Sequence, residues 1–580
     1  MRLVLYNNRV QDIALDRFEI DMKKKIYLLA SFCCLVHSIG YAQQPRLIVQ
    51  IIIDQLRGDQ LVRYQKHFSD TGFNYLLNNS LNYQQAYHPH ANTTTCAGHA
   101  TIATGSYPAL HGIVNNEWYD SLNKKMIYCT EDIQASIIPN RFTQEPLPGR
   151  SPRNIMVSTL SDEIVLANKG RAFAVSYKDR SAITLAGHAG KAFWFDTTHG
   201  GFITSDWYYK QYPTWVSEWN KGYQASDFTW NLQKPAQEYT NFSSSPIIQN
   251  DQFFGQKFPH QVTHQKGQNY FKALSKTPKA DQLSADFAIQ LLAAEKLGSD
   301  PGKTDYLAIS FSAVDAIGHH FGANSLEAED NLMVLDKTLS HLLKNIDTNV
   351  GLANTLIILT ADHGVNDPPN YLTQHHFAAP QPLNLAALTQ FIHTILKNHQ
   401  LPTEILTTII PPYIYFNDDL MRNQNMSMSQ LTDIMTTELM RRSEIFRAFT
   451  LPIVSHGWLS AKVSRMYYPY RTGQIYLVQP SNQAHGAKNT CRVNHGSPWN
   501  YDRYVPLLFV NPHFKKSLFT REVHTTDIAP TLSVLLNIKV PSGAVGQTLP
   551  EVISNFNAIT EITTKVPGEQ TNSAAKAHND

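Results

Sequence analysis

The stretch LIILTADHG, residues 356–364, gives the strongest indication of the fold. Its first six residues are apolar or β-branched and run directly into Asp362, His363 and a glycine. A strand loses its polar alternation when both of its faces are covered, so the run predicts a buried strand of a parallel sheet. Asp362 and His363 then lie at the carboxyl end of that strand, where open α/β sheets bind ligands. A plain Asp-His-Gly turn that closes a strand is the alternative.

The same arrangement recurs elsewhere in the chain. Three more apolar runs lead into charged residues: 46–53 into Asp54, 172–177 into Lys178, and 306–312 toward Asp315. Apolar residues at helical spacing between 332 and 346 predict a helix that packs on the core. We therefore expect an α/β protein built on a mostly parallel sheet with helices on both faces.

Length and composition favour one large globular domain. The chain has 580 residues, of which 42% are hydrophobic and 17% are charged. We expect a single α/β domain over 43–559, with insertions at about 190–260 and 372–494. The first insertion is rich in Trp and Tyr and is expected to pack over the site. A net charge of +2 argues against a nucleic-acid binder.

The N-terminus predicts export. Lysines at 23–25, an apolar run at 26–36 and small residues at 40 and 42 follow the order of a secretory signal peptide. That run is too short for a bilayer anchor, and no later run is long enough to be a transmembrane helix. We expect translation to start at Met22, removal of residues 1–42, and a periplasmic or secreted location. The polar residues 560–580 are expected to be disordered.

Three cysteines remain after the predicted cleavage, namely Cys96, Cys129 and Cys491. They allow one disulfide and leave one thiol. Whether Cys129 pairs with Cys491 is open at this point. No Cys-x-x-Cys zinc-finger spacing is present.

Six Asp and His side chains have the pattern of metal ligands. The set is Asp54, Asp315, His319, Asp362, His363 and His495. Asp315 and His319 are four residues apart, which puts both on one face of a helical turn. Neighbouring side chains at a strand end point to opposite sides, so Asp362 and His363 could reach two different ions. Three Asp and three His suffice for two metals with three protein ligands each, and mixed ligation favours zinc over magnesium or calcium.

Thr95 is the candidate nucleophile. Residues 92–105 are rich in Thr, Ala and Gly and predict a loop that enters a helix near Thr95. A hydroxyl there faces free backbone N–H groups and the positive end of the helix dipole, which suits a group that carries a phosphoryl. Lys178 and Arg180, two residues apart on extended chain, would point the same way and clamp an oxyanion. An ordinary Thr cap and solvated loop charges are the alternatives.

Together these motifs resemble the alkaline phosphatase superfamily, in particular the periplasmic zinc-dependent phosphatases of the PafA type. The resemblance covers about residues 46–549. It rests on these motifs: Asp54-Gln55-Leu56-Arg57, Thr95-x-x-Gly98-His99, His111-Gly112-Ile113-x-x-Asn116-x-Trp118, Lys178-Asp179-Arg180, Asp315-x-x-x-His319, Asp362-His363-Gly364 and His495-Gly496-Ser497-Pro498.

The resemblance implies a phosphomonoesterase with two Zn²⁺ per chain that hydrolyses small phosphorylated substrates through a phosphothreonine at Thr95. The implied ligands are Asp54, Asp362 and His363 for one zinc, and Asp315, His319 and His495 for the other. This grouping keeps Asp362 and His363 together, unlike the split inferred from the strand end. Asn116, Lys178 and Arg180 are implied to bind phosphoryl oxygens. The triple Thr93-Thr94-Thr95 departs from the family pattern. We choose Thr95 because His99 follows it by four residues, and the neighbouring Cys96 is unusual.

Four alternative functions differ in what they require. A phosphodiesterase or nucleotide pyrophosphatase uses the same metal site but usually lacks the Lys-x-Arg pair. A sulfatase needs Cys-x-Pro-x-Arg, which residues 96–100 do not supply. A cofactor-independent mutase of the superfamily would be cytoplasmic, against the predicted export. An inactive zinc-binding protein would need neither the nucleophile nor the full ligand set.

Overall fold

The computed structural model describes residues 44–140, 146–241, 254, 257–264, 268–453, 456–483 and 493–564. The predicted signal peptide, Cys491 and residues 565–580 lie outside this part of the chain. Residues 44–553 form one compact unit. Within the described residues, no helix combines the length and apolar character needed to cross a bilayer.

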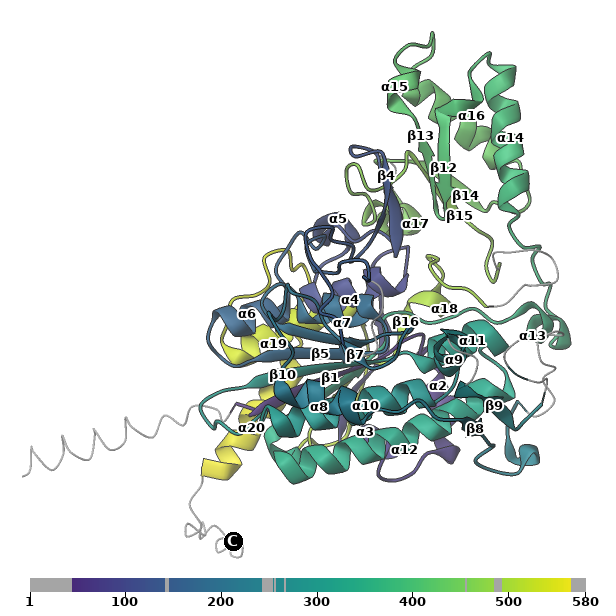
Figure 1. The fold of residues 1–580 in the computed structure, drawn as a ribbon. Helices are drawn as coiled ribbons and strands as arrows, with labels where there is room; N and C mark the ends of the chain where they lie inside the picture. Colours follow the sequence, from purple (N-terminus) through teal and green to yellow (C-terminus); the bar gives the residue numbers. More distant parts are fainter. Residues whose placement is uncertain are drawn as a thin grey trace, which may run out of the picture. The chain divides into compact units, whose positions relative to one another are not determined.

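A ten-stranded sheet forms the centre of this unit (Figure 1). Its strands are β1 (Leu47–Ile53), β2 (Ser80–Tyr87), β5 (Ala172–Ser176), β6 (Lys191–Phe195), β7 (Phe202–Ile203), β10 (Asp305–Phe311), β11 (Thr355–Thr360), β16 (Tyr504–Val505), β17 (Leu508–Val510) and β18 (Ser517–His524). The order is β16-β2-β17-β11-β1-β10-β5-β6-β7, and β18 pairs with β2. The five strands from β11 to β6 run parallel, which confirms the mostly parallel sheet.

The three central strands align their carboxyl ends. Every residue of β1, β10 and β11 is buried, as their unbroken apolar runs predict. Ile53 of β1 pairs with Phe311 of β10, and Ile52 pairs with Thr360 of β11. The residues that follow these strands therefore meet at one edge of the sheet.

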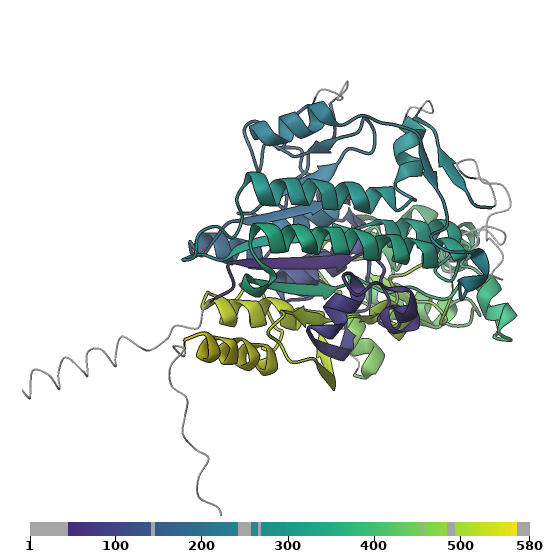
Figure 2. The same cartoon turned by 90° about the horizontal axis from the view of Figure 1, so that it is seen from below.

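Helices cover both faces of the sheet. Figure 1 shows α4 (Thr95–Thr104) and α7 (Asp179–Ala186) on one side, and α10 (Lys279–Ala294) and α12 (Leu326–Asn349) on the other. Figure 2 shows the two long helices α10 and α12 lying side by side, and they contact each other. Alternate residues of β1, such as Val49 and Ile51, join leucines of α10 and α12 in the largest apolar core.

The Trp- and Tyr-rich segment packs differently from the expectation. Strands β6 and β7 belong to the main sheet, so this part of residues 190–260 is not an insertion outside it. Phe202 stacks on Phe287 of α10 with ring centroids 4.0 Å apart, and Trp215 lies 5.1 Å from the same ring. These aromatic side chains enlarge the core, whereas Trp194 of the same segment lines a cavity together with Lys178 and Arg180.

The region 372–494 contains a second, antiparallel sheet with its own core. The sheet consists of β12 (Leu406–Ile410), β13 (Tyr413–Phe416), β15 (Ile475–Val478) and β14 (Arg447–Thr450), in that order. Helices α14 (Leu385–Asn398) and α16 (Met428–Leu439) pack on it (green in Figure 1). A hairpin of β3 (Glu117–Asp120) and β4 (Lys125–Tyr128) is hydrogen-bonded to neither sheet, but its Trp118 and Tyr119 pack against Tyr413 and Tyr415 of β13.

The apolar residues 505–510 form two short strands, β16 and β17, and Pro506 between them has no N–H for a sheet hydrogen bond. Both pair antiparallel with β2. Helix α20 runs from Pro550 to Thr564, so the helix passes the expected domain end at 559.

Candidate metal centre and active site

Three neighbouring strands deliver the candidate ligands. Asp54 directly follows β1, and Asp362 and His363 follow β11 after one residue. Asp315 lies in the first turn of α11 (Ala313–Phe321), which follows β10, and His319 lies one turn later, as the i,i+4 spacing predicts. Asp54, Asp362 and His363 have no solvent-exposed surface.

The first group consists of Asp54, Asp362 and His363. One ligand atom of each lies within 4.8 Å of the others. His363 Nε2 is 3.3 Å from Asp54 Oδ1 and 3.4 Å from Asp362 Oδ2, and all three atoms are buried without a hydrogen-bond partner. Buried polar atoms are rarely left unpaired. Two carboxylate oxygens and one imidazole nitrogen that face one another are a donor set that fits Zn²⁺.

The second group consists of Asp315, His363 and His495, again within 4.8 Å. His495 Nε2 is 3.6 Å from Asp315 Oδ1, and the ring of His495 stacks on that of His363 at 3.5 Å. His319 Nε2 is 3.0 Å from the same Asp315 oxygen. His363 therefore belongs to both groups here, whereas Asp362 belongs to one.

The three imidazoles share one orientation, which sequence reasoning did not find. In each case Nδ1 faces a backbone carbonyl: Gly364 O at 2.9 Å for His363, Val493 O at 3.2 Å for His319, and Thr93 O at 2.9 Å for His495. A carbonyl only accepts, so Nδ1 carries the proton and donates. Nε2 is therefore the nitrogen that faces the carboxylates and is placed to bind a metal.

Lys178 partly neutralises the carboxylates. Its Nζ lies 2.7 Å from Asp54 Oδ2 and 2.5 Å from Asp315 Oδ2. Burial and the charge of Asp315 would raise the pKa of Asp54, but Lys178 and His363 lower it overall. Burial works against protonation of His363, yet Asp362 and Asp54 raise its pKa to about 9. The site thus concentrates negative charge that attracts cations.

Gln55 links the two ligand groups and was also missed. Its N–H donates to Asp362 Oδ1 at 3.2 Å, and its Nε2 donates to Asp315 Oδ1 at 2.7 Å. The residue has φ 74°, an unusual value for a side chain other than glycine. A Cβ on Gly318 would lie 2.0 Å from Gln55 Oε1, which explains a glycine one residue before His319. No sequence signal marks this role, because it depends on the backbone turn.

Residues at the start of helix α4 contact a member of each ligand group. Thr95 is its first residue and is buried, while Thr94 is the N-cap and makes no side-chain capping bond. The ordinary Thr cap is therefore not observed. Thr93 O binds His495, and His99 Nδ1 lies 3.1 Å from Asp362 Oδ2.

The backbone conformation at Lys178 and Arg180 differs from the extended chain that was expected. Lys178 precedes α7 and Arg180 lies in its first turn, so the two residues are not on extended chain. The Arg180 guanidinium lies near Tyr128, and its Nε has no hydrogen-bond partner although it is buried. Lys178 and Arg180 line a cavity of about 340 Å³. A second cavity of about 410 Å³ is lined by residues that include Thr94, Asn116, His495, Ser497 and Tyr501.

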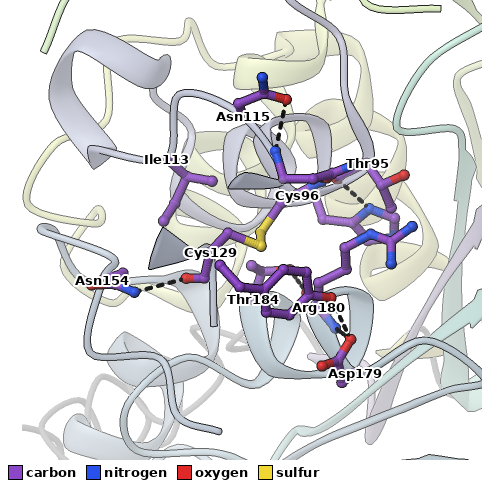
Figure 3. The surroundings of a disulfide bond; sticks show 12 residues. Thr95, Cys96, Ile113, Asn115, Cys129, Asn154, Asp179, Arg180 and Thr184 are labelled. Atoms are coloured by element: carbon purple, nitrogen blue, oxygen red, sulfur yellow. Dashed lines mark hydrogen bonds between the residues drawn. A yellow bond between two sulfur atoms is a disulfide. The ribbon is translucent and has the colours of Figure 1, made fainter. Parts of the chain in front are cut away.

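The open cysteine pairing is resolved as Cys96 with Cys129 (Figure 3). Cys96 is the second residue of α4, next to Thr95, and Cys129 follows β4. Asn116 lies before β3, and its Oδ1 accepts a hydrogen bond from Cys96 N at 2.9 Å. The disulfide thus lies beside the candidate nucleophile and a candidate phosphoryl-binding residue.

Known proteins match nearly the whole described chain. A family model described as type I phosphodiesterase / nucleotide pyrophosphatase matches residues 48–409. Alkaline phosphatase PafA of Elizabethkingia meningoseptica is 31% identical, over 88% of this chain and 95% of that protein. Alkaline phosphatase PhoV of Synechococcus elongatus is 30% identical, over 88% of this chain and 93% of that protein. The crystal structure of wild-type PafA superposes with a TM-score of 0.80, 30% identity, and coverage of 88% of this chain and 99% of that one.

Proposed function

This chain belongs to the type I phosphodiesterase / nucleotide pyrophosphatase family, a family of hydrolases, and on that premise we propose that it is a zinc-dependent phosphomonoesterase. The proposed substrates are small phosphate monoesters. The proposed ligands of two zinc ions are Asp54, Asp362 and His363 for one, and Asp315, His319 and His495 for the other. The unpaired buried atoms of the first group support this assignment.

The observation that carries the proposal is the position of Thr95. It begins α4 between Thr93, whose carbonyl binds His495, and His99, which approaches Asp362. A hydroxyl at this point faces the positive end of the helix dipole and lies beside both ligand groups. The same chain segment thus joins the nucleophile to the proposed metal ligands.

In the proposed reaction, Thr95 Oγ1 attacks phosphorus. The Oγ1–P bond forms, the bond from phosphorus to the ester oxygen breaks, and the alcohol leaves. Water then hydrolyses the phosphothreonine, which releases inorganic phosphate and restores the hydroxyl. When bound, zinc supplies Lewis-acid stabilisation of the charge on the attacking and leaving oxygens. Asn116 donates its amide N–H to a phosphoryl oxygen, and Arg180 and Lys178 meet the dianionic charge of a monoester.

The experiment that tests this function compares three threonines. We expect Thr95→Ala to fold and to retain zinc, measured by elemental analysis, while it loses nearly all hydrolysis of p-nitrophenyl phosphate. Thr93→Ala and Thr94→Ala are the matched controls, because their hydroxyls are buried without a partner, and they should keep most activity. Phosphoryl label trapped on Thr94 would assign the nucleophile to that residue instead.

A phosphodiesterase is the second candidate, because the matching family model carries that description. It differs in charge: a diester carries one negative charge fewer and needs fewer cations. The presence of both Lys178 and Arg180 near Asp54 favours the monoester. A rate on a bis-ester above the rate on the monoester would reverse the assignment.

We also infer that the protein is exported. The lysines at 23–25 and the apolar residues 26–36 support this inference. N-terminal sequencing of the protein from the periplasm or medium should begin at Gln43. A first residue at Met1 or Met22 would contradict it.

A further inference from the structure

The disulfide and two hydrogen bonds of Asn116 together form a closed ring of contacts. Cys96 and Cys129 are both buried, and their bond joins α4 to the β3–β4 hairpin (Figure 3). Asn116 Oδ1 accepts from Cys96 N at 2.9 Å, and the main-chain oxygen of Asn116 accepts from Cys129 N at 2.9 Å. One residue is thus hydrogen-bonded to both halves of the disulfide.

This ring determines which way the Asn116 amide faces. The N–H of Cys96 only donates, so it must meet the amide oxygen, and the amide NH₂ takes no part in this bond. The N–H of Asn116 donates to Asn115 Oδ1 at 2.8 Å, and Asn115 Nδ2 donates to Pro411 O at 3.0 Å. The contacts to the two cysteines and to Asn115 fix the position of Asn116, and its amide NH₂ is the donor that could bind an oxyanion.

The last residue of the same hairpin, Tyr128, lies close to Arg180. Tyr128, next to Cys129, donates its hydroxyl to Asp179 Oδ1 at 2.7 Å and lies within hydrogen-bonding reach of the Arg180 guanidinium. Arg150 Nε binds the other Asp179 oxygen at 2.7 Å, and its guanidinium lies 4.7 Å from the centre of the Tyr128 ring. The hairpin therefore carries the contacts of two candidate phosphoryl-binding groups.

We propose that the Cys96–Cys129 disulfide is a positioning element of the active site. It locks the hairpin to the first turn of α4, so that the Asn116 amide and the Tyr128-bound Arg180 guanidinium meet a phosphoryl group carried by Thr95. The proposal rests on the function proposed above. A small misplacement of binding groups reduces the rate of a reaction strongly.

The test is a double-mutant cycle between the disulfide and Asn116. Cys96→Ala/Cys129→Ala should bind zinc like the parent protein but lose about tenfold in kcat/KM on p-nitrophenyl phosphate. Asn116→Ala should cost about tenfold in the parent, and less than about threefold in the bridge-free protein, because the amide is then already misplaced. Equal costs of Asn116→Ala in both backgrounds would overturn the proposal, because a structural disulfide gives additive losses.

Controls separate this result from a failure of the proposed function. Leu122→Ala, at the exposed tip of the same hairpin, should leave kcat/KM unchanged. The proposed function would be rejected if the parent protein were inactive on the monoester or if the Thr95→Ala variant kept full activity. Neither of these outcomes depends on the disulfide.

A second preparation guards against misfolding of the variant. The unmodified chain is purified from a reducing cytoplasm, its thiols are counted with Ellman's reagent, and the bridge-free fraction is compared with the bridged one. The same loss in kcat/KM at equal zinc content supports the proposal. A bridge-free chain that does not fold in either preparation overturns it, since the bond then serves folding.

Discussion

At the scale of single residues, the site depends on close approaches that only glycine allows. A Cβ on Gly98 would lie 2.1 Å from the backbone oxygen of Asp362, which belongs to a rigid strand end. A Cβ on Gly318 would meet only the end of the Gln55 side chain, which can move. A side chain at Gly98 would meet backbone, whereas a side chain at Gly318 would meet only a flexible side chain.

These two contacts predict that alanine is tolerated less well at Gly98 than at Gly318. Gly98→Ala should lower both the melting temperature and zinc content, because α4 must shift away from Asp362. Gly318→Ala should keep the fold and weaken zinc binding, because displaced Gln55 no longer holds Asp315. Thermal melts and zinc titrations of the two variants measure this difference. Equal melting temperatures would contradict it.

Lys178 and Arg180 should decide between monoester and diester. Removal of either leaves a phosphoryl oxygen less well paired, which costs about 1.5–3 kcal/mol for a charged hydrogen bond, or roughly ten- to a few-hundred-fold in kcat/KM. Lys178→Ala and Arg180→Ala should therefore reduce monoester hydrolysis much more than bis-ester hydrolysis. Zinc content serves as the control, since Lys178 also contacts Asp54 and Asp315. Equal losses on both substrates would show that Lys178 and Arg180 have a structural role and do not recognise the extra charge of a monoester.

At the scale of elements, the N-terminal part of α12 anchors residues 228–241 and 260–262. Glu327 lies 3.1 Å from His260 Nε2, and Glu329 accepts from Thr240 N at 2.8 Å. Asp330 accepts from Trp230 Nε1 at 2.6 Å and from Gln233 N at 2.8 Å. Acidic side chains suit the N-terminus of a helix, and here they also satisfy buried donors.

Asp330→Ala should loosen this segment without harming the chemistry. It leaves the Trp230 indole N–H buried and unpaired, at a cost of about 1–3 kcal/mol. Faster proteolysis within residues 228–241 and a lower melting temperature are expected, with kcat/KM within a few-fold of the parent. Surface-exposed Asp300→Ala is a control of the same residue type. A large loss of activity would show that the segment does act on the site.

At the scale of the whole molecule, neutral buried histidines link stability to pH. His111 Nδ1 accepts from Ile113 N at 3.1 Å, so its Nε2 donates to Thr101 Oγ1 at 3.2 Å. The Thr101 hydroxyl then donates to His90 Nε2 at 3.0 Å. Burial, aided by Arg471, lowers the pKa of His111 to about 3. Protonation would break this chain of hydrogen bonds.

The sign of the pH effect follows from that shift. Below the unfolded-state pKa of about 6.5 the unfolded chain binds a proton that folded His111 does not, so stability falls as pH drops from about 6.5 toward 3 and is complete above 6.5. His111→Gln should be less stable at pH 7.5, and its deficit should shrink by about 1.4 kcal/mol per pH unit below 6.5. Urea unfolding of both proteins at several pH values measures the deficit. A deficit that does not change with pH would contradict the assignment.

Local patterns in the amino-acid sequence were enough to predict the central strands and the location of several candidate ligands. The apolar runs at β1, β10 and β11 predicted buried strands, and the i,i+4 spacing of Asp315 and His319 predicted one helix face, because burial and periodicity are properties of neighbouring residues. The family resemblance grouped Asp54 with Asp362, and the structure brings one ligand atom of each within 4.8 Å of the other.

Contacts between residues far apart in the chain came only from the folded arrangement. The pairing of Cys96 with Cys129 requires the β3–β4 hairpin to fold back on α4, and the bond of Gln55 to Asp315 requires a left-handed turn beside another strand. The placement of Trp215 in the core depends on the free face of α10. Such contacts are selected by the packing of whole elements, and packing is not encoded in the spacing of nearby residues.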